Sequence, residues 1–210
     1  TGTSLEAIKT QALATIRAAV ALHENQAQAL KDITASVANA KAQISLAKVE
    51  ELIKTDAATA IDNAAATATD AIGVATMLEA ISEARQTALT AIAEQVELVQ
   101  NADAQLEQVR REAQDAIYHA ANAAIVAING AEADEYAQPI KEQAITSISE
   151  TEVSATDAIT EALTMAAVTT TKEEALTKIE TIQTQALEDI AALVSLTQAQ
   201  AQAVSAVQDS

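Results

Sequence analysis

The sequence predicts an all-α protein, an elongated antiparallel helical bundle or coiled-coil-like rod of about four long helices. Alanine, the strongest helix former, fills about a quarter of the 210 positions. Three Gly and one Pro are the only strong helix breakers, so strands and tight turns are nearly excluded. Without Phe or Trp, and with two Tyr, a compact core would be underfilled. Small side chains instead let long helices approach one another closely.

Helix-start signals and the rare breakers divide the chain into four expected helices. Thr-x-x-Glu-Ala-(Ile/Leu) sequences begin at Thr3, Thr76 and Thr171 and match the capping box, in which Thr and Glu each satisfy a free backbone amide. The breakers are Gly2, Gly73, Gly130 and Pro139. The expected helices run from Thr3 to Ile72, Thr76 to Asn129, Glu132 to Val168, and Thr171 to Val207.

These helices group into three expected segments: residues 1–75 as a first long helical segment, 76–130 as a second long helix, and 131–210 as a helical hairpin. We expect them to form one continuous elongated unit. The first helix is long enough to break, and the two candidate places are His23–Gln26, where large apolar residues are missing, and the cap-like pair Thr55-Asp56.

The apolar residues recur at helical spacing rather than at strict heptad spacing. Within residues 76–129 the large apolar residues follow a mean step close to 3.6, with Ala in the gaps. Residues 171–207 alternate an apolar face with Glu, Gln, Thr and Lys, as an amphipathic helix does. Because a seven-residue repeat does not persist, antiparallel packing or mixed spacing is favoured over a two-stranded zipper.

Short sequences recur along the chain and indicate degenerate helical repeats. One set consists of Ala60–Ala65, Ala116–Ala121 and Ala158–Leu163, which share the pattern Ala-Ile-x-x-Ala. A second set shares Ala-(Leu/Ile)-x-x-Ile and consists of Thr10–Ile16, Gln86–Ile92, Glu142–Ile148 and Thr184–Ile190. The intervals between copies differ, so the repeat is irregular.

This combination resembles the Ala/Thr-rich helical stalk repeats of giant cell-wall-anchored surface proteins of Gram-positive bacteria, of the staphylococcal extracellular-matrix-binding-protein type. Ala71 to Ile92 and Ala158 to Ile190 carry the resemblance, with weaker cover at the start and around Ala127 to Ile148. It implies helical modules stacked into a fibrous stalk, without catalytic residues. Asn129-Gly130 and Pro139 depart from the pattern in one copy.

A second resemblance is to the helical stalks of phage tail fibres, in which runs such as Thr184 to Ile190 line a parallel trimer. In that arrangement the regions of Gly73 and Gly130 would be kinks rather than hairpins. The capping boxes favour hairpins.

Charge and composition exclude several classes of partner. The net charge of −18 and the pI near 4.3 oppose binding to nucleic acid and to anionic bilayers. Without Cys there is no disulfide and no thiolate metal site. No stretch approaches eighteen unbroken apolar residues, so we expect no membrane insertion. The chain starts at Thr1 rather than Met, as expected of a chain whose leader was removed or of a fragment.

No group of residues predicts a metal, cofactor or catalytic site. His23 and His119 lack a metal-binding partner at His-x-x-x-His or Glu-x-x-His spacing and are expected to be solvated or to pack at edges. The acidic groups Glu50-Glu51, Glu173-Glu174 and Glu132–Glu135 lack the order of a calcium loop. Carboxylates at helix starts, favoured by the helix dipole, are the expected role.

The remaining polar and aromatic residues are also given structural roles. Arg110-Arg111 lies among Glu107, Glu112 and Asp115, which predicts a solvated ion-pair face. Tyr118 and Tyr136 are expected to pack at the edges of helix contacts. Thr55, Thr59, Thr67 and Thr69 do not keep one face, which argues against an ice-binding surface.

The sequence therefore predicts a non-catalytic structural spacer or stalk module without cofactors, at the cell surface or outside the cell. Its expected partners are proteins, either other copies or neighbouring modules, bound through helix–helix packing. The alternatives are a subunit of a self-assembling fibre or virion appendage with parallel oligomeric coils, and a module that binds a partner helix through an exposed apolar seam.

Overall fold

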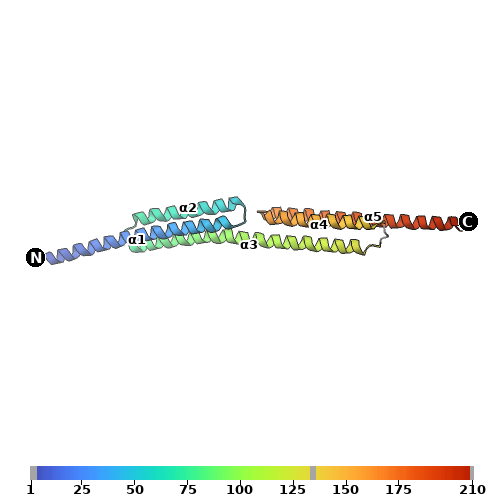
Figure 1. The fold of residues 1–210 in the computed structure, drawn as a ribbon. Coiled ribbons are helices and arrows are strands. Elements are labelled where there is room, and N and C mark those ends of the chain that lie inside the picture. Colours follow the sequence, from blue (N-terminus) through green and yellow to red (C-terminus); the bar gives the residue numbers. More distant parts are fainter. Residues whose placement is uncertain (1–3, 133–135, 209–210) are drawn as a thin grey trace. The chain divides into compact units, whose positions relative to one another are not determined.

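The computed structural model describes residues 4–132 and 136–208, which form five α-helices and no β-strand (Figure 1). The helices are α1 (Leu5–Leu46), α2 (Glu51–Val74), α3 (Leu78–Gly130), α4 (Gln138–Glu161) and α5 (Met165–Gln208). The all-α fold class predicted from the sequence is confirmed, with five helices in place of about four. The chain divides into two units, Thr1–Ala104 and Gln105–Ser210, and their boundary falls within α3.

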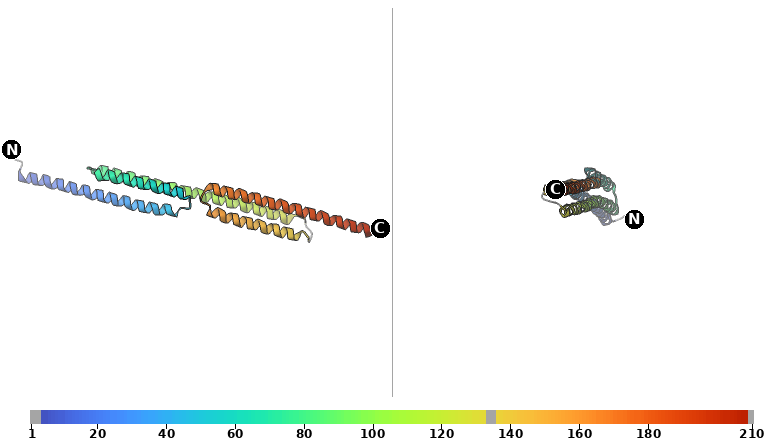
Figure 2. Two further views of the ribbon diagram at one scale, coloured as in Figure 1. Left: turned by 90° about the horizontal axis from the view of Figure 1, so that it is seen from above. Right: turned by 90° about the vertical axis from the view of Figure 1, so that its right-hand side faces the viewer.

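Unit 1 is a bundle of α1, α2 and the part of α3 that ends at Ala104 (Figure 2). The Lys41 ammonium pairs with the Asp62 carboxylate at 2.7 Å, which joins α1 to α2. Because Gln26 also bonds to the carbonyl of Ala75, α2 runs antiparallel to α1. The pairs Asp32–Arg85 and Gln43–Gln100 join α1 to α3. The residue numbers of α1 and of α3 both increase from the first pair to the second, so α1 and α3 run parallel.

Unit 2 repeats this arrangement with the second part of α3, with α4 and with α5. Arg110 bonds to the carbonyl of Ala162, and Lys141 bonds to the carbonyl of Ala131. The two contacts lie at opposite ends of α4 and show that α4 runs antiparallel to α3. Gln114, which bonds to Thr160, gives the same register.

Each unit buries one narrow stripe of Ala and Ile on every helix, which we call the Ala/Ile stripe. Its members are Ala29, Ile33, Ala40 and Ile44 in α1; Ala57, Ile61, Ala68 and Ile72 in α2; Ile81, Ala88, Ile92 and Val99, then Ala113, Ile117, Ala124 and Ile128 in α3; Ala144, Ile148, Ala155 and Ile159 in α4; and Val168, Ala175, Ile179, Ala186 and Ile190 in α5. All of them are at most 7% exposed. Burial is thus confined to one side of each helix.

Members of the stripe are separated by steps of four and seven residues. In α2, for example, Ala57 is followed by Ile61, Ala68 and Ile72. The pattern therefore recurs every eleven residues, which corresponds to about 3.67 residues per turn. This value is close to the 3.6 of a straight α-helix, so the stripe stays on one side with little supercoiling. The alternation of four-residue and seven-residue steps is the mixed spacing that the sequence predicted.

The register places large side chains level with small ones across antiparallel helices. In unit 2, the Arg110–Ala162 and Ala131–Lys141 contacts place Ile117 level with Ala155. The resulting levels between α3 and α4 are Ala113 with Ile159, Ile117 with Ala155, Ala124 with Ile148, and Ile128 with Ala144. In unit 1 the Gln26–Ala75 contact gives Ala29 with Ile72, Ile33 with Ala68, Ala40 with Ile61, and Ile44 with Ala57. Between α1 and α2, and between α3 and α4, an isoleucine thus lies level with an alanine at each of these positions.

The first expected helix, Thr3 to Ile72, is wrong because the chain turns back at residues 47–50. Neither candidate break is used, since α1 runs through His23–Gln26 and α2 runs through Thr55-Asp56. The turn contains no Gly or Pro. It is held instead by burial of Ala47 and Val49, which are 8% and 2% exposed. Segment 1–75 therefore contains two helices.

The expected capping boxes do not start the helices. Thr3 lies outside the described residues, and Ser4 caps α1 by accepting a hydrogen bond from the Ala7 amide. Thr171 lies inside α5, whose first amides are capped by Thr164. α3 begins at Leu78, with Ile81 bonded to the carbonyl of Met77 rather than to Thr76. The Thr-x-x-Glu pattern was therefore a poor guide to helix starts in a chain so rich in both residues.

Of the remaining expected helix boundaries, those of residues 132–168 differ from the observed helix, and those of residues 76–129 agree closely with the observed one. The expected helix Glu132 to Val168 is α4, Gln138–Glu161, which begins with Pro139 in its first turn. Proline is well tolerated there because the first amides of a helix have no internal acceptor. The expected helix from Thr76 to Asn129 corresponds closely to α3. Residues 131–210, expected as a hairpin, contain α4 and α5.

Exchanging the residues at one level tests the pairing of Ile with Ala. Ile117→Ala should lower the free energy of unfolding by about 2–4 kcal/mol by leaving a cavity. Ala155→Ile should cost about 1–3 kcal/mol through overpacking. The double variant should lose at least about 1 kcal/mol less than the sum, because the volumes are restored. Urea denaturation followed by circular dichroism measures this, with the exposed Val126→Ala as control; additive losses would contradict the register.

A second pair of variants tests where α5 and α3 begin. Thr164→Ala should lower the free energy of unfolding by about 1 kcal/mol, because the Ala167 amide, 3.1 Å from Oγ1, loses its acceptor. Thr76→Ala should change it by less than about 0.5 kcal/mol. The same denaturation experiment compares them, and equal losses would show that Thr76 does cap α3.

Candidate functional site

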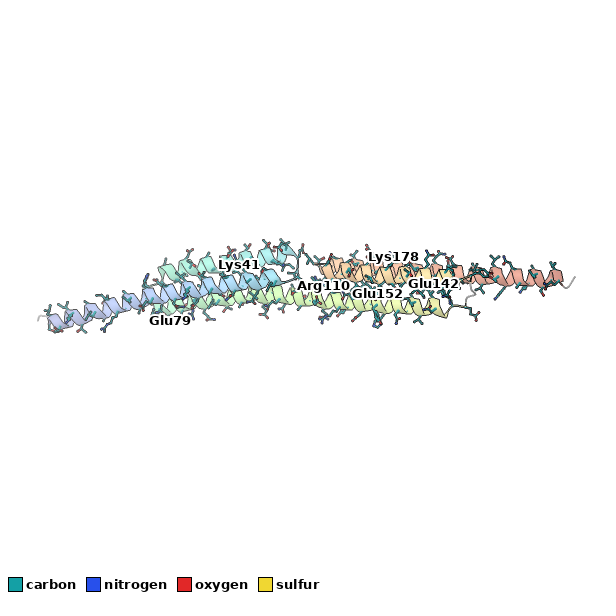
Figure 3. All side chains as sticks on the ribbon, in the orientation of Figure 1. Lys41, Glu79, Arg110, Glu142, Glu152 and Lys178 are labelled. Atoms are coloured by element: carbon teal, nitrogen blue, oxygen red, sulfur yellow. The ribbon has the colours of Figure 1, made fainter. Side chains whose placement is uncertain are left out.

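The most distinctive polar side chains of the fold lie where one helix ends beside another. Arg110 is 3% exposed, and its Nε and Nη2 atoms donate to the carbonyl of Ala162, the C-cap residue of α4. Its Nη1 atom pairs with the Glu107 carboxylate at 3.1 Å. The expectation of a solvated ion-pair face is therefore wrong for Arg110, labelled in Figure 3. Arg111 is exposed.

Gln26 occupies the corresponding place in unit 1. Its Nε2 atom donates to the carbonyls of Ile72 and Ala75 at 3.0 and 3.2 Å. Ala75 is the C-cap residue of α2, as Ala162 is of α4. Gln26 and Arg110 thus satisfy carbonyls that a helix end leaves without a partner.

Lys141 makes a similar contact at the other end of unit 2. It is 8% exposed, and its ammonium donates to the carbonyls of Asn129 and Ala131 at 3.1 and 2.6 Å. Both carbonyls lie at the C-terminal end of α3, where the helix dipole favours a positive charge. Lys141 therefore fastens the start of α4 to the end of α3.

In unit 1 a carboxylate fastens the turn that joins α1 to α2. Asp103 of α3 accepts a hydrogen bond from the backbone amide of Lys48 at 2.8 Å. This contact holds the turn at residues 47–50, which has no Gly or Pro to specify it. A tertiary contact thus replaces local turn chemistry.

Together these contacts set the axial register of the helices. The two units carry the helix-end contact of Gln26 and Arg110 and the stripe at matching positions, because Gln26, Ala29 and Ile33 correspond to Arg110, Ala113 and Ile117, 84 residues later. In α2 and α4 the offset is 87, as for Ile61 and Ile148. The difference of three matches the connections, residues 47–50 in unit 1 and 131–137 in unit 2.

Sequence reasoning missed these residues although a signal was present. Arg110 lies four residues after the buried Leu106 and three before the buried Ala113, so it falls within the apolar stripe. The carboxylates of its neighbours Glu107 and Glu112 indicated ion pairs on the helix surface instead. A charged residue at a stripe position indicates a buried contact with a carbonyl.

The histidines and tyrosines do not gather into a site. His23 and His119 are both exposed. Tyr118 and His119 approach each other edge to face, with ring centroids 5.6 Å apart, on the exposed side of α3. Tyr118 is 55% and Tyr136 is 64% exposed.

The carboxylates remain spread over the surface (Figure 3). Among the described residues no three His, Cys, Asp or Glu side chains come together to hold a metal ion. Glu50, Glu51, Glu173 and Glu174 are exposed. Of the third acidic group, Asp134 and Glu135 lie outside the described residues.

Shallow grooves follow the helices of both units. One of about 720 Å³ in unit 1 lies between α1 and α3 and contains the Asp32–Arg85 ion pair, 2.7 Å long. A groove of about 610 Å³ in unit 2 follows the second half of α5, beside Tyr136. Amide, small and aliphatic side chains line both grooves, with Asp32, Arg85 and Glu97 in the first and Tyr136 in the second.

One helix of the described residues, α5, is long and apolar enough to cross a membrane. Its most apolar window has a mean hydropathy of 1.3 and is 6% buried. A single helix that meets this test on length and composition is weak grounds for a membrane span.

Comparisons with protein-family models, with curated proteins and with solved structures found no match to this chain.

Variants of Arg110 test the buried contact at the end of α4. Arg110→Ala should lower the free energy of unfolding by about 2–4 kcal/mol, because the Ala162 carbonyl and Glu107 both lose a buried partner. Arg110→Gln should recover part of the loss, since Gln26 makes the equivalent contact in unit 1. Denaturation by urea measures both, with the exposed neighbour Arg111→Ala as control. Equal effects of Arg110→Ala and Arg111→Ala would contradict the assignment.

Proposed function

We propose that this chain is a non-catalytic structural spacer built from successive three-helix units. The observation that carries the proposal is the recurrence of the Ala/Ile stripe and of the helix-end contact at offsets of 84 and 87 residues. A stripe that recurs in successive units is typical of a repeat protein, in which the number of units sets the length of the spacer. An active site would not need its supporting core to recur.

The geometry of each helix supports the same proposal. An eleven-residue period keeps the contact stripe on one side with little supercoiling, so a helix can be lengthened without changing its neighbours. Stability then comes from many small contacts among the Ala and Ile side chains of the stripe. The 44 residues of α5 extend over about 66 Å at 1.5 Å per residue.

The surface chemistry and the resemblance of residues 71–92 and 158–190 to stalk repeats support a place at the cell surface or outside the cell. The net charge of −18 keeps neighbouring chains apart and opposes collapse onto anionic surfaces. A chain without Cys needs no control of its redox state. Its proposed partners are proteins that pack helix against helix.

A second candidate, a subunit of a self-assembling fibre, is favoured by the exposed apolar residues near both ends of the described chain. Leu5 and Ile8 in α1 are 79% and 56% exposed, and Leu196 in α5 is 54% exposed. Such residues could pair between copies. The two candidates differ in whether the chain associates with itself.

Light scattering and small-angle X-ray scattering on one sample test the spacer. We expect the mass of one chain, 21.7 kDa, and a radius of gyration well above the roughly 17 Å of a compact domain of this length. Both values should stay constant over a hundredfold range of concentration. A trimer or polymer would favour the fibre, and a compact monomer would contradict both candidates.

A further inference from the structure

Three segments of the chain share one pattern: Leu, then Gln or Arg four residues later, then Ala after three, then Ile or Val after four. The pattern consists of Leu22, Gln26, Ala29 and Ile33 in α1, of Leu106, Arg110, Ala113 and Ile117 in α3, and of Leu196, Gln200, Ala203 and Val207 in α5. Residues 184–207 also match residues 10–33 along their whole length, with identical residues at half of the positions. The end of α5 therefore repeats the part of α1 that enters unit 1.

The structure buries the end of this pattern in α1 and α3 but not in α5. Ala29 and Ile33 are each 2% exposed, and Ala113 and Ile117 are 3% and 0% exposed. In α5 the corresponding segment is exposed: Leu196 is 54% exposed, and Gln200 and Ala203 are exposed as well. The last buried residue of α5 is Ile190.

We propose that residues 196–207 of α5 are a docking surface for an antiparallel helical hairpin with the stripe of α2 and of the unit 1 part of α3. The first helix of that hairpin would place an Ile level with Ala203, as Ile72 lies level with Ala29. Its C-terminal carbonyls would accept from Gln200, as those of Ile72 and Ala75 accept from Gln26. The inference does not depend on the spacer function, because a binding module would use the same surface.

Two helices, rather than one, are needed to cover the segment. In unit 1 the corresponding part of α1 contacts α2 through Gln26 and contacts α3 through the Asp32–Arg85 ion pair. The surface lies on the same helix as the buried stripe that ends at Ile190 but on another side of it, because thirteen residues at about 100° each place Ala203 about 220° around the helix from Ile190. The groove of about 610 Å³ beside this segment is lined by Leu193, Leu196, Gln200 and Val204, and Ala203 and Val207 lie outside its lining.

Neither a second copy nor a membrane matches this surface as well. Another copy has no free hairpin, because α2 and α4 already bury their stripes within their own units. A lipid surface would leave the amides of Gln198, Gln200 and Gln202 without partners in hydrocarbon. A hairpin with carbonyls at its helix end satisfies one of them directly.

Joining residues 34–104 directly after Val207 tests the proposal. The added chain continues the helix in the register of α1 and supplies the hairpin at high effective concentration. Hydrogen exchange followed by mass spectrometry should show that the amides of residues 196–207 exchange at least about 10-fold more slowly than in the original chain. Unchanged exchange would overturn the proposal.

Matched variants of the extended chain separate docking from a general effect of the fusion. Ala203→Glu should abolish the protection, because its equivalents Ala29 and Ala113 are buried. Ser205→Glu should leave it intact, because the equivalent residues Lys31 and Asp115 are exposed. Two alanines inserted after Val207 rotate the added stripe by about 200° and should also abolish it.

Hydrogen exchange of the original chain tests the two other occupants, a second copy and a lipid surface. Its residues 196–207 should exchange at the same rate over a hundredfold range of concentration and in the presence of phosphatidylcholine vesicles. Protection that rises with concentration would assign the surface to a second copy and overturn the proposal. Protection by vesicles would do the same in favour of a lipid surface. Equal protection in the Ala203→Glu and Ser205→Glu variants would also count against it.

Discussion

The packing of isoleucine level with alanine between α1 and α2, and between α3 and α4, is the constraint on which both units depend. Neither residue could form this core alone: alanine removes little apolar surface, and a stripe made only of isoleucine would hold the helix axes further apart. Alternating them keeps the helix axes close over the whole contact. Because the steps of four and seven residues add to eleven, the alternation continues along a nearly straight helix without drifting off the contact side.

Polar contacts then determine which levels meet. The stripe could slide by one eleven-residue repeat without a large loss of packing, since each repeat resembles the next. Gln26, Arg110 and Lys141 bond to carbonyls at helix ends, and these occur at one axial position only. Sliding would leave buried donors and carbonyls unsatisfied, which costs more than the small change in apolar contact. The helix ends thus provide the specificity that the stripe lacks.

The continuous stripe and the contacts at the helix ends also account for the proposed roles. A unit whose core is a continuous stripe and whose register is set at its ends can be followed by another unit of the same kind, as the matching positions of the two units indicate. The exposed end of α5 carries the first residues of such a pattern. A spacer and a docking surface for a helical hairpin are therefore two consequences of one arrangement.

Composition and periodicity determined that the chain is all-α, with Ala-rich contact faces and with long helices such as α3, because these properties depend on local propensity and on the spacing of apolar residues. The turn at residues 47–50, the true start of α5 at Met165 and the burial of Arg110 were decided by the tertiary structure. Each depends on a partner distant in sequence: Asp103 holds the Lys48 amide, and the carbonyl of Ala162 holds Arg110. Local patterns such as Thr-x-x-Glu carry no information about those partners, and so they misplaced the helix ends.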